Sequence, residues 1–124
     1  MHGVRILVIA WNNAKILSDT LPSLMSARDA LTGAELIVVD NGSTDDTSQT
    51  VRELCPSARL IRSEVNLGYS AGINLGSQDL TPESHLVILN ADVSPDRDAI
   101  PRLLEGISPG VGVVVPRLVG PDGQ

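Results

Sequence analysis

Residues 36–47 read LIVVDNGSTDDT, an apolar run followed by a polar turn. The run is short, rich in β-branched residues and bounded by polar ones, so it predicts a buried strand that leads into a turn and the start of a helix. Ser43 or Thr44 can cap that helix. Asp40 is not needed for capping. It stands at the carboxyl end of the predicted strand, the edge where open α/β sheets bind ligands.

The composition is that of one globular domain. The 124 residues are 42% hydrophobic and 19% charged, with a formal net charge of -6. This charge argues against a nucleic acid as partner, because phosphate backbones are bound by clusters of Lys and Arg. A polyphosphate ligand would need a metal ion to offset its charge. The single cysteine excludes an intrachain disulfide, and no apolar run approaches the roughly 18 residues of a membrane-spanning helix.

Predicted strands and helices alternate along the chain. Strands are expected at residues 4–10, 35–39, 58–62, 85–89 and 111–115. Helices are expected from about residue 14 to residue 33, with Pro22 restarting the helix near Thr20, and at residues 45–54, 69–78 and 98–106. This order predicts an α/β fold with a mostly parallel open sheet, covered by helices on both faces.

The C-terminal residues carry a turn sequence, Pro121-Asp122-Gly123. Too few residues follow this turn to complete another strand or helix. We therefore expect residues 1–124 to form a single domain that is incomplete at its C-terminal side.

Three glycines recur every four residues in the predicted helix at 69–78 and just before it, at Gly68, Gly72 and Gly76. A glycine inside a helix costs about 1 kcal/mol relative to alanine, so a compensating interaction is expected. Two explanations remain open. The helix packs tightly against the sheet, or a ligand approaches its glycine face closely.

Residues 86–93 read LVILNADV, a buried strand that ends in Asn90 and Asp92. An amide and a carboxylate two residues apart can face the same way and meet a hydrated divalent cation that carries diphosphate oxygens. By themselves they are also common turn residues. Their position makes the metal interpretation stronger, because Asn12, Asp40 and Asp92 all fall at carboxyl ends of predicted parallel strands, on one edge of the sheet.

Four segments in this order resemble the family 2 glycosyltransferases with the GT-A fold, most closely their rhamnosyltransferase-like members. The segments are VIAWN at 8–12, VVDNGSTD at 38–45, NLGYSAGIN at 66–74 and LNAD at 89–92. The resemblance spans essentially the whole chain. It implies a nucleotide-diphospho-sugar donor, a Mg²⁺ or Mn²⁺ ion, and transfer with inversion to a saccharide or lipid-linked acceptor in polysaccharide biosynthesis. It also implies a cytoplasmic protein, with peripheral contact to the inner face of the membrane left open.

The resemblance assigns roles to individual positions. Asp40 matches the aspartate that bonds the base, and Asp92 matches the metal-binding carboxylate. Asn90 stands where the family has the first Asp of its DxD motif, and Trp11 stands where Thr or Tyr is commoner. The residues assigned to substrate binding are Ala10, Trp11, Asn12, Asp40, Asn41, Asn66, Gly68, Asn74 and Asn90.

Inverting transfer needs a general base, which the resemblance puts beyond residue 124 together with the acceptor pocket. We therefore expect this chain to bind nucleotide better than it catalyses transfer. Two other classes remain as alternatives. A sugar nucleotidyltransferase is disfavoured because no Gly-rich loop with Arg or Lys follows the first strand. A noncatalytic nucleotide-binding or interaction module is the nonenzyme alternative.

Overall fold

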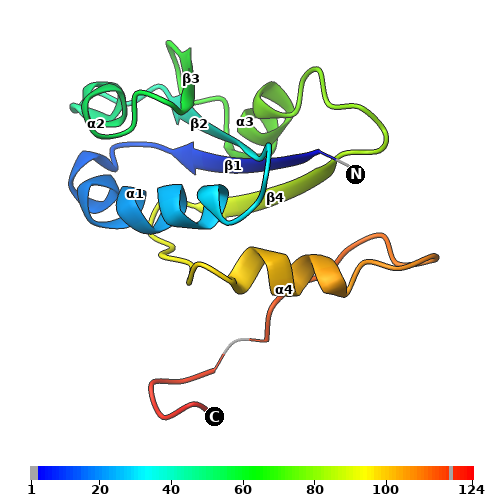
Figure 1. The fold of residues 1–124 in the computed structure, drawn as a ribbon. Helices are drawn as coiled ribbons and strands as arrows, with labels where there is room; N and C mark the ends of the chain where they lie inside the picture. Colours follow the sequence, from blue (N-terminus) through cyan, green and yellow to red (C-terminus); the bar gives the residue numbers. More distant parts are fainter. Residues whose placement is uncertain (1–2, 118) are drawn as a thin grey trace.

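The structure is a computed structural model that describes residues 3–117 and 119–124 (Figure 1). Strands and helices alternate along the chain, which confirms the predicted α/β class. In chain order the elements are β1 (Val4–Ala10), α1 (Ala14–Asp29), β2 (Glu35–Asn41), α2 (Thr47–Leu54), β3 (Arg59–Ser63), α3 (Tyr69–Gly76), β4 (His85–Asn90) and α4 (Ala99–Glu105).

The four strands form one parallel sheet in the order β3-β2-β1-β4. In the register of the sheet, Ala10 lies beside Asp40 and Ile9 lies beside Asn90. The polar ends of β1, β2 and β4 therefore meet at one edge, as the sequence predicts. Among the described residues, no helix combines the length and the apolar character that crossing a membrane requires.

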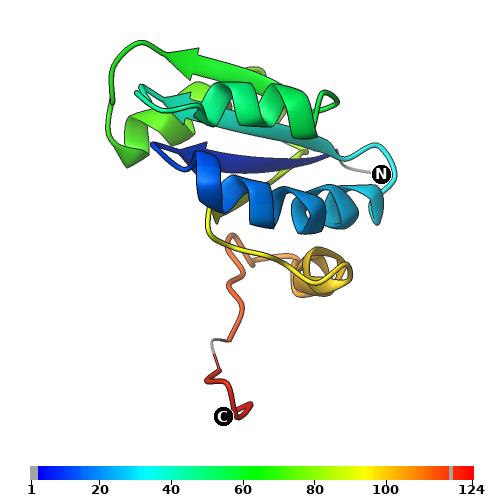
Figure 2. The ribbon, with the colours of Figure 1, turned by 90° about the vertical axis from the view of Figure 1, so that its left-hand side faces the viewer.

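The side chains of the strands alternate between two separate cores. One core lies under α1 and α2 and includes Ile6, Val8, Leu36 and Val38. The other lies under α3, on the opposite face (Figure 2), and consists of Leu7, Ile9, Ile37 and Val39, with partly buried residues around them. Both faces of the sheet are therefore covered, which explains why these strands are nearly continuous apolar runs.

The predicted fifth strand is wrong. Residues 111–115 are irregular, and the chain after α4 extends away from the sheet in both views (Figures 1 and 2). Val113 and Val115 are 80% and 76% exposed, while Val114 packs beside Gly106 at the end of α4. A run of valines favours a strand only where the chain lies beside a sheet edge with which it can pair. This segment does not lie beside one.

The predicted break in the first helix is also wrong. Helix α1 runs from Ala14 to Asp29 with Pro22 in its interior, and it ends before residue 33. An internal proline costs about 3 kcal/mol because it removes one backbone hydrogen bond and crowds the preceding turn. Here Leu17, Leu21 and Leu24 are fully buried on one face of the helix. Their burial outweighs the cost of the proline.

The glycine spacing of α3 is explained by packing for two of its three members. A Cβ on Gly76 would lie 2.2 Å from Cδ1 of Leu7, and a Cβ on Gly72 would lie 3.3 Å from Cγ2 of Ile9. Gly68 is different, because it precedes the helix with a φ of 87° and faces open space. The absence of side chains at the first two positions lets α3 lie close against β1.

Arg5, which interrupts the apolar run of β1, joins three elements at the amino end of the sheet. It is 7% exposed, and its Nε donates to Oε2 of Glu35 at 2.9 Å. Its Nη1 donates to the carbonyl oxygens of Gly76 at 3.2 Å and Gln78 at 2.7 Å, at the C-terminal end of α3. A buried guanidinium is tolerated here because its hydrogen bonds compensate for lost water.

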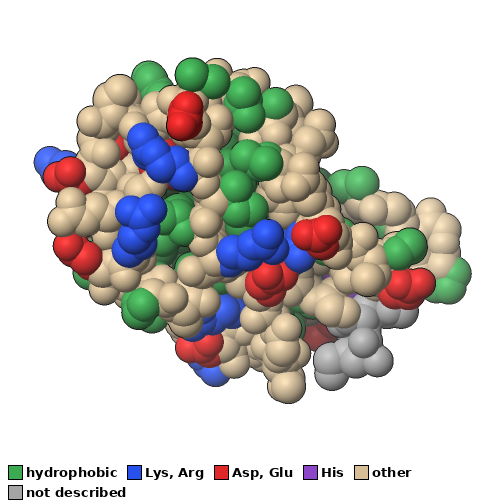
Figure 3. Space-filling view, turned by 90° about the horizontal axis from the view of Figure 1, so that it is seen from above, with side chains coloured by type: hydrophobic (Ala, Val, Ile, Leu, Met, Phe, Trp, Pro, Cys, Tyr) green, Lys and Arg blue, Asp and Glu red, His purple; other side chains and the backbone are tan. Residues whose placement is uncertain are grey.

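The charged side chains on the face shown in Figure 3 are of both signs, with Lys and Arg interspersed among Asp and Glu. Such a surface produces no extended field of one sign. Recognition of a charged ligand on this face would therefore depend on local groups.

Gly42 makes the closest backbone approach at the carboxyl edge of the sheet. Its φ is 80°, and a Cβ there would lie 2.4 Å from the carbonyl carbon of Val65 and 2.5 Å from the backbone nitrogen of Asn66. The loop after β2 and the segment before α3 thus touch through backbone atoms. A side chain at position 42 would force the two segments apart.

We predict that Gly42→Ala destabilises the protein more than Gly33→Ala. Both glycines have positive φ, so a left-handed alanine lowers the free energy of unfolding of either variant by about 1–2 kcal/mol. Gly33 has open space around its Cβ position, whereas the contact at Gly42 adds about 1–3 kcal/mol of overpacking. Urea denaturation of both variants measures the difference. Equal midpoints would show that the contact between the two loops is not tight.

Candidate functional site

A pocket of about 380 Å³ opens at the carboxyl edge of the sheet. It is bounded by the ends of β1, β2 and β4 and by the start of α3. The residues that line it are Ile9, Ala10, Trp11, Asn13, Asn41, Asn66, Tyr69, Asn90, Ala91 and Asp92. The pocket therefore combines aromatic rings, amides and one carboxylate, and it occupies the edge that the sequence indicates for ligand binding.

The alternation of strand side chains determines which of them reach the pocket. Ile9 and Asn41 lie on the α3 face of the sheet, and Asn90 follows Leu86 and Ile88 at the same parity of β4. Asp40 lies on the other parity of β2 and turns toward α2. Asp40 and Asn41 are both buried, but they face opposite sides of the sheet, so that Asn41 lines the pocket and Asp40 does not.

Two aromatic side chains stand at the pocket, and they are the single Trp and the single Tyr of a sequence without Phe. Trp11 is 51% exposed and Tyr69 is 50% exposed. Exposed aromatic rings beside polar groups suit a ligand with an apolar, planar face. The Tyr69 hydroxyl also donates to Oδ1 of Asn90 at 2.9 Å, which joins the start of α3 to the end of β4.

Asn41 holds the segment that passes over the pocket. Its Oδ1 accepts from the backbone N–H of Leu67 at 2.9 Å, and its Nδ2 donates to the carbonyl of Gly68 at 3.0 Å. Within the segment, Oδ1 of Asn66 accepts from the N–H of Gly68 at 2.8 Å. These bonds fix the entry into α3 and hence the position of Tyr69.

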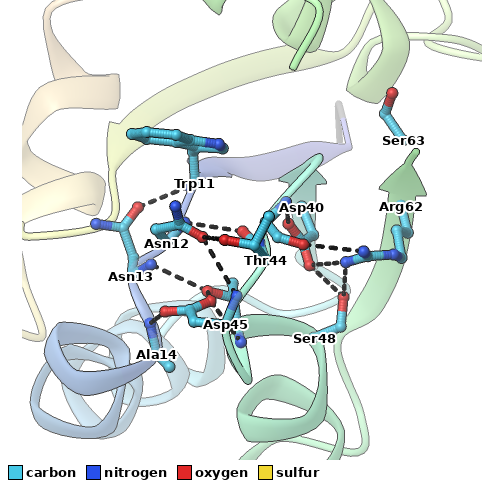
Figure 4. Close-up of polar contacts among 12 residues, drawn as sticks. Trp11, Asn12, Asn13, Ala14, Asp40, Thr44, Asp45, Ser48, Arg62 and Ser63 are labelled. Carbon is cyan, nitrogen blue, oxygen red and sulfur yellow. Dashed lines mark hydrogen bonds and ion pairs between the residues drawn. The ribbon is translucent and has the colours of Figure 1, made fainter. Parts of the chain in front are cut away.

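Asp40 is fully buried near the end of β2 and does not line the pocket; Figure 4 shows its polar contacts. Its carboxylate accepts from the N–H of Ser43 at 3.0 Å, from Nη1 of Arg62 at 2.7 Å and from the Ser48 hydroxyl. Burial alone would raise the pKa of Asp40, but the bonds from Ser43 and Ser48 and the charge of Arg62 outweigh it and lower the pKa. Asp40 is therefore an ionised anchor for the loop after β2.

The loops after β1 and β2 are joined by side chains that sequence reasoning assigned differently. Asn12 accepts at Oδ1 from the N–H of Thr44 at 2.8 Å and donates its own N–H to the Ser43 hydroxyl at 2.8 Å (Figure 4). The predicted cap of α2 by Ser43 or Thr44 is wrong, because these residues bond to the β1 loop. Asp46 is the N-cap residue of α2 and makes no side-chain cap bond, while Asp45 before it accepts from the N–H groups of Thr47 at 3.0 Å and Ala14 at 3.2 Å.

The structure separates the predicted site residues into two groups. Those that line the pocket are Ala10, Trp11, Asn41, Asn66, Asn90 and Asp92. Those that do not are Asn12 and Asp40, which hold loops, Gly68, whose backbone carries the bonds described above, and Asn74, which is exposed on α3. The structure also adds Asn13 and Tyr69. Tyr69 could have been singled out as the single tyrosine of the chain, within a predicted ligand-facing segment.

The described residues contain no group of three or more His, Cys, Asp or Glu that could hold a metal ion. Asp92 is exposed and is the carboxylate of the pocket lining. One carboxylate suits a Mg²⁺-like ion that shares its coordination with ligand phosphates and water, whereas it does not suit an ion held by protein alone. Asp92 therefore fits the metal ion that the resemblance implies, as one ligand of an ion that phosphates and water also coordinate.

Comparisons with known proteins agree with this geometry. The sequence matches the family described as Glycosyl transferase family 2 over residues 5–124. A relative from Edwardsiella ictaluri, undecaprenyl-phosphate 4-deoxy-4-formamido-L-arabinose transferase, is 29% identical over 120 residues, covering 90% of this chain and 35% of the relative. The Mycobacterium tuberculosis N-acetylglucosaminyl-diphospho-decaprenol L-rhamnosyltransferase is 27% identical over 131 residues, covering 96% and 42%.

Among solved structures, the mannosyltransferase PcManGT from Pyrobaculum calidifontis, in complex with GDP-Man and Mn²⁺, superposes with a TM-score of 0.68 at 26% identity. The match covers 82% of this chain and 31% of the PcManGT chain. The fold is thus the predicted GT-A class, and the chain spans less than half the length of these relatives. Because the match to the family spans residues 5–124, the chain belongs to glycosyl transferase family 2.

Proposed function

We propose that residues 3–117 form the donor-binding part of a glycosyltransferase and that the pocket at the carboxyl edge binds a nucleotide-diphospho-sugar. The observation that carries this proposal is the convergence of Trp11, Asn90 and Asp92 in one pocket of a family 2 chain. The aromatic ring can contact the base of such a donor, and the amide can contact its oxygen atoms. The carboxylate can hold the metal ion that accompanies the diphosphate.

Asp92 would hold the metal ion together with phosphate oxygens of the donor. The solved structure of PcManGT with GDP-Man and Mn²⁺ supports a divalent ion in this fold. When bound, Mg²⁺ or Mn²⁺ would stabilise negative charge on the departing nucleoside diphosphate. The remaining lining residues bind and orient the donor. Trp11 offers a ring face to the base, and Asn66 and Asn90 offer their amides to oxygen atoms of the donor.

Transfer would proceed with inversion to a saccharide or lipid-linked acceptor. The names of two relatives contain the polyprenyl carriers undecaprenyl phosphate and decaprenol, which supports a lipid-linked acceptor and contact with a membrane surface. Asp92 is the carboxylate in the pocket lining and is assigned to the metal, so the general base is expected outside the described residues. This chain alone should therefore bind the donor without efficient transfer.

The products distinguish this proposal from the nucleotidyltransferase alternative. A glycosyltransferase releases a nucleoside diphosphate from the donor, whereas a sugar nucleotidyltransferase releases pyrophosphate from a triphosphate. A noncatalytic module would release neither and would bind nucleotide without a requirement for Asp92. Chromatographic analysis of the products separates the three classes.

We predict that one of UDP, GDP and dTDP binds in the presence of Mn²⁺ and that Asp92→Ala weakens this binding about tenfold or more. The reason is that the variant removes the carboxylate that would hold the ion. Calorimetry with and without Mn²⁺ measures the effect. Asp19→Ala on the exposed face of α1 removes the same charge and should bind like the wild type. Metal-dependent binding that survives in Asp92→Ala would contradict the assignment.

Asp40 would support donor binding through the loop that it anchors, because its side chain does not line the pocket. We predict that Asp40→Asn lowers the free energy of unfolding by about 2 kcal/mol at pH 7, through weaker bonds to Arg62, Ser43 and Ser48. Nucleotide affinity should fall with it.

The effect of Asp40→Asn should depend on pH. Because folding lowers the pKa of Asp40 below its usual 3.8, ionised Asp40 contributes its full stabilisation well above that value. The contribution is lost as pH falls through the lower folded-state pKa. The stability gap between wild type and Asp40→Asn should therefore narrow in acid. Urea denaturation at pH 7 and near pH 3 tests this, and a gap that stays constant would refute it.

A further inference from the structure

The four asparagines that line the pocket share one arrangement of their amides. In each, the side-chain oxygen accepts a hydrogen bond from the protein itself. Asn13 accepts from the N–H of Trp11 at 2.7 Å, and Asn90 accepts from the Tyr69 hydroxyl at 2.9 Å. Asn41 and Asn66 accept from backbone N–H groups of residues 67 and 68. Because each oxygen already accepts one bond, the orientation of each amide is set and its NH₂ group is directed to other contacts.

Three of these NH₂ groups have no hydrogen-bond partner among the described residues, those of Asn13, Asn66 and Asn90. Asn66 and Asn90 are exposed, and Asn13 is half-buried. The fourth asparagine, Asn41, is buried, and its NH₂ group donates to the carbonyl oxygen of Gly68. The pocket thus presents three uncharged donor groups, each with a fixed orientation.

We propose that the pocket recognises oxygen atoms of a nucleoside diphosphate through the NH₂ groups of Asn13, Asn66 and Asn90, and that Tyr69 is a positioning residue that sets the direction of the Asn90 amide. This inference rests on the proposed function. It makes Asn90 a hydrogen-bond donor to the nucleotide, although it occupies the position of a carboxylate in the DxD motif. Asp92 then remains the anionic group at the end of β4.

The charge of the pocket supports this assignment. Its lining contains one charged side chain, Asp92, and neither Lys nor Arg. Phosphate and ribose oxygens accept hydrogen bonds, so a lining without cations can bind them through neutral N–H donors. An Asn90 that turned its oxygen outward would instead place an acceptor next to those oxygens. The bond from Tyr69 to Oδ1 of Asn90 favours the opposite orientation, with the NH₂ group available to the nucleotide.

Asn90→Asp separates the two possible roles of position 90. The change replaces the NH₂ group by an oxygen and adds a negative charge. If Asn90 donates to the nucleotide, binding of UDP, GDP or dTDP with Mn²⁺ should weaken about tenfold. If the side chain of residue 90 is a metal ligand, the same change should strengthen metal-dependent binding. Gln78→Glu, an exposed amide-to-acid change outside the pocket, is the matched control and should leave affinity unchanged.

A double-mutant cycle tests the role of Tyr69. Tyr69→Phe keeps the ring and removes the hydroxyl, so it should weaken nucleotide binding about threefold by freeing the Asn90 amide to rotate. In the Asn90→Ala background the same change should have no effect. An equal loss in both backgrounds would mean that the hydroxyl acts without Asn90, which would overturn the positioning role.

The full set of measurements is calorimetry of the wild type and variants with each nucleotide and Mn²⁺, with thermal unfolding to verify that all are folded. Weaker binding by Asn90→Asp, Asn66→Ala and Tyr69→Phe supports the inference. Wild-type binding with unchanged affinity in folded Asn90→Asp and Asn66→Ala overturns it and leaves the proposed function standing. A folded wild type that binds none of the three nucleotides overturns both.

Discussion

The site depends on one constraint, the alternation of side chains along a β-strand. In β2 it sends Asp40 toward α2 and the next residue, Asn41, toward α3. The buried carboxylate of Asp40 accepts from the buried Ser48 and from the partly exposed Arg62, and it anchors the loop after the strand. Asn41 reaches the segment before α3 and holds it through both ends of its amide. The pocket between these loops exists because two adjacent polar residues serve opposite faces of the sheet.

The buried charge and the ligand-facing groups are thereby kept apart. Neither Asp40 nor Arg62 lines the pocket, and hydrogen bonds compensate the buried Asp40 carboxylate for its loss of water. Apart from Asp92, the pocket is lined by uncharged aliphatic, aromatic and amide side chains, which lose less hydration than charges when they are covered. Asp92, at the rim, is exposed. In a chain of net charge -6, this arrangement would limit the repulsion that the proposed nucleotide donor meets.

Apolar runs and turn residues were sufficient to predict four strands, the parallel sheet and the edge that carries the pocket. Alternation along 36–41 could also have placed Asp40 with Leu36 and Val38, on the face away from Asn41. The partners of these residues could not be predicted, because Arg62 and Tyr69 reach them through the fold and not through sequence spacing. The prediction of a strand at residues 111–115 was wrong for a related reason. Their valines suit a strand, but strand formation needs a neighbouring edge that local sequence does not specify.

The position of β1 in the sheet has a consequence for the way the chain folds. Its two neighbours are β2 and β4, so the first strand cannot be paired on both sides until residues 85–90 are available. Arg5 adds a contact across 71 residues, to the carbonyl oxygen of Gly76. Closing such long loops costs chain entropy before the contacts reward it, which slows folding. On the ribosome, β1 is therefore synthesised early but gains its second neighbour only after β4 has emerged.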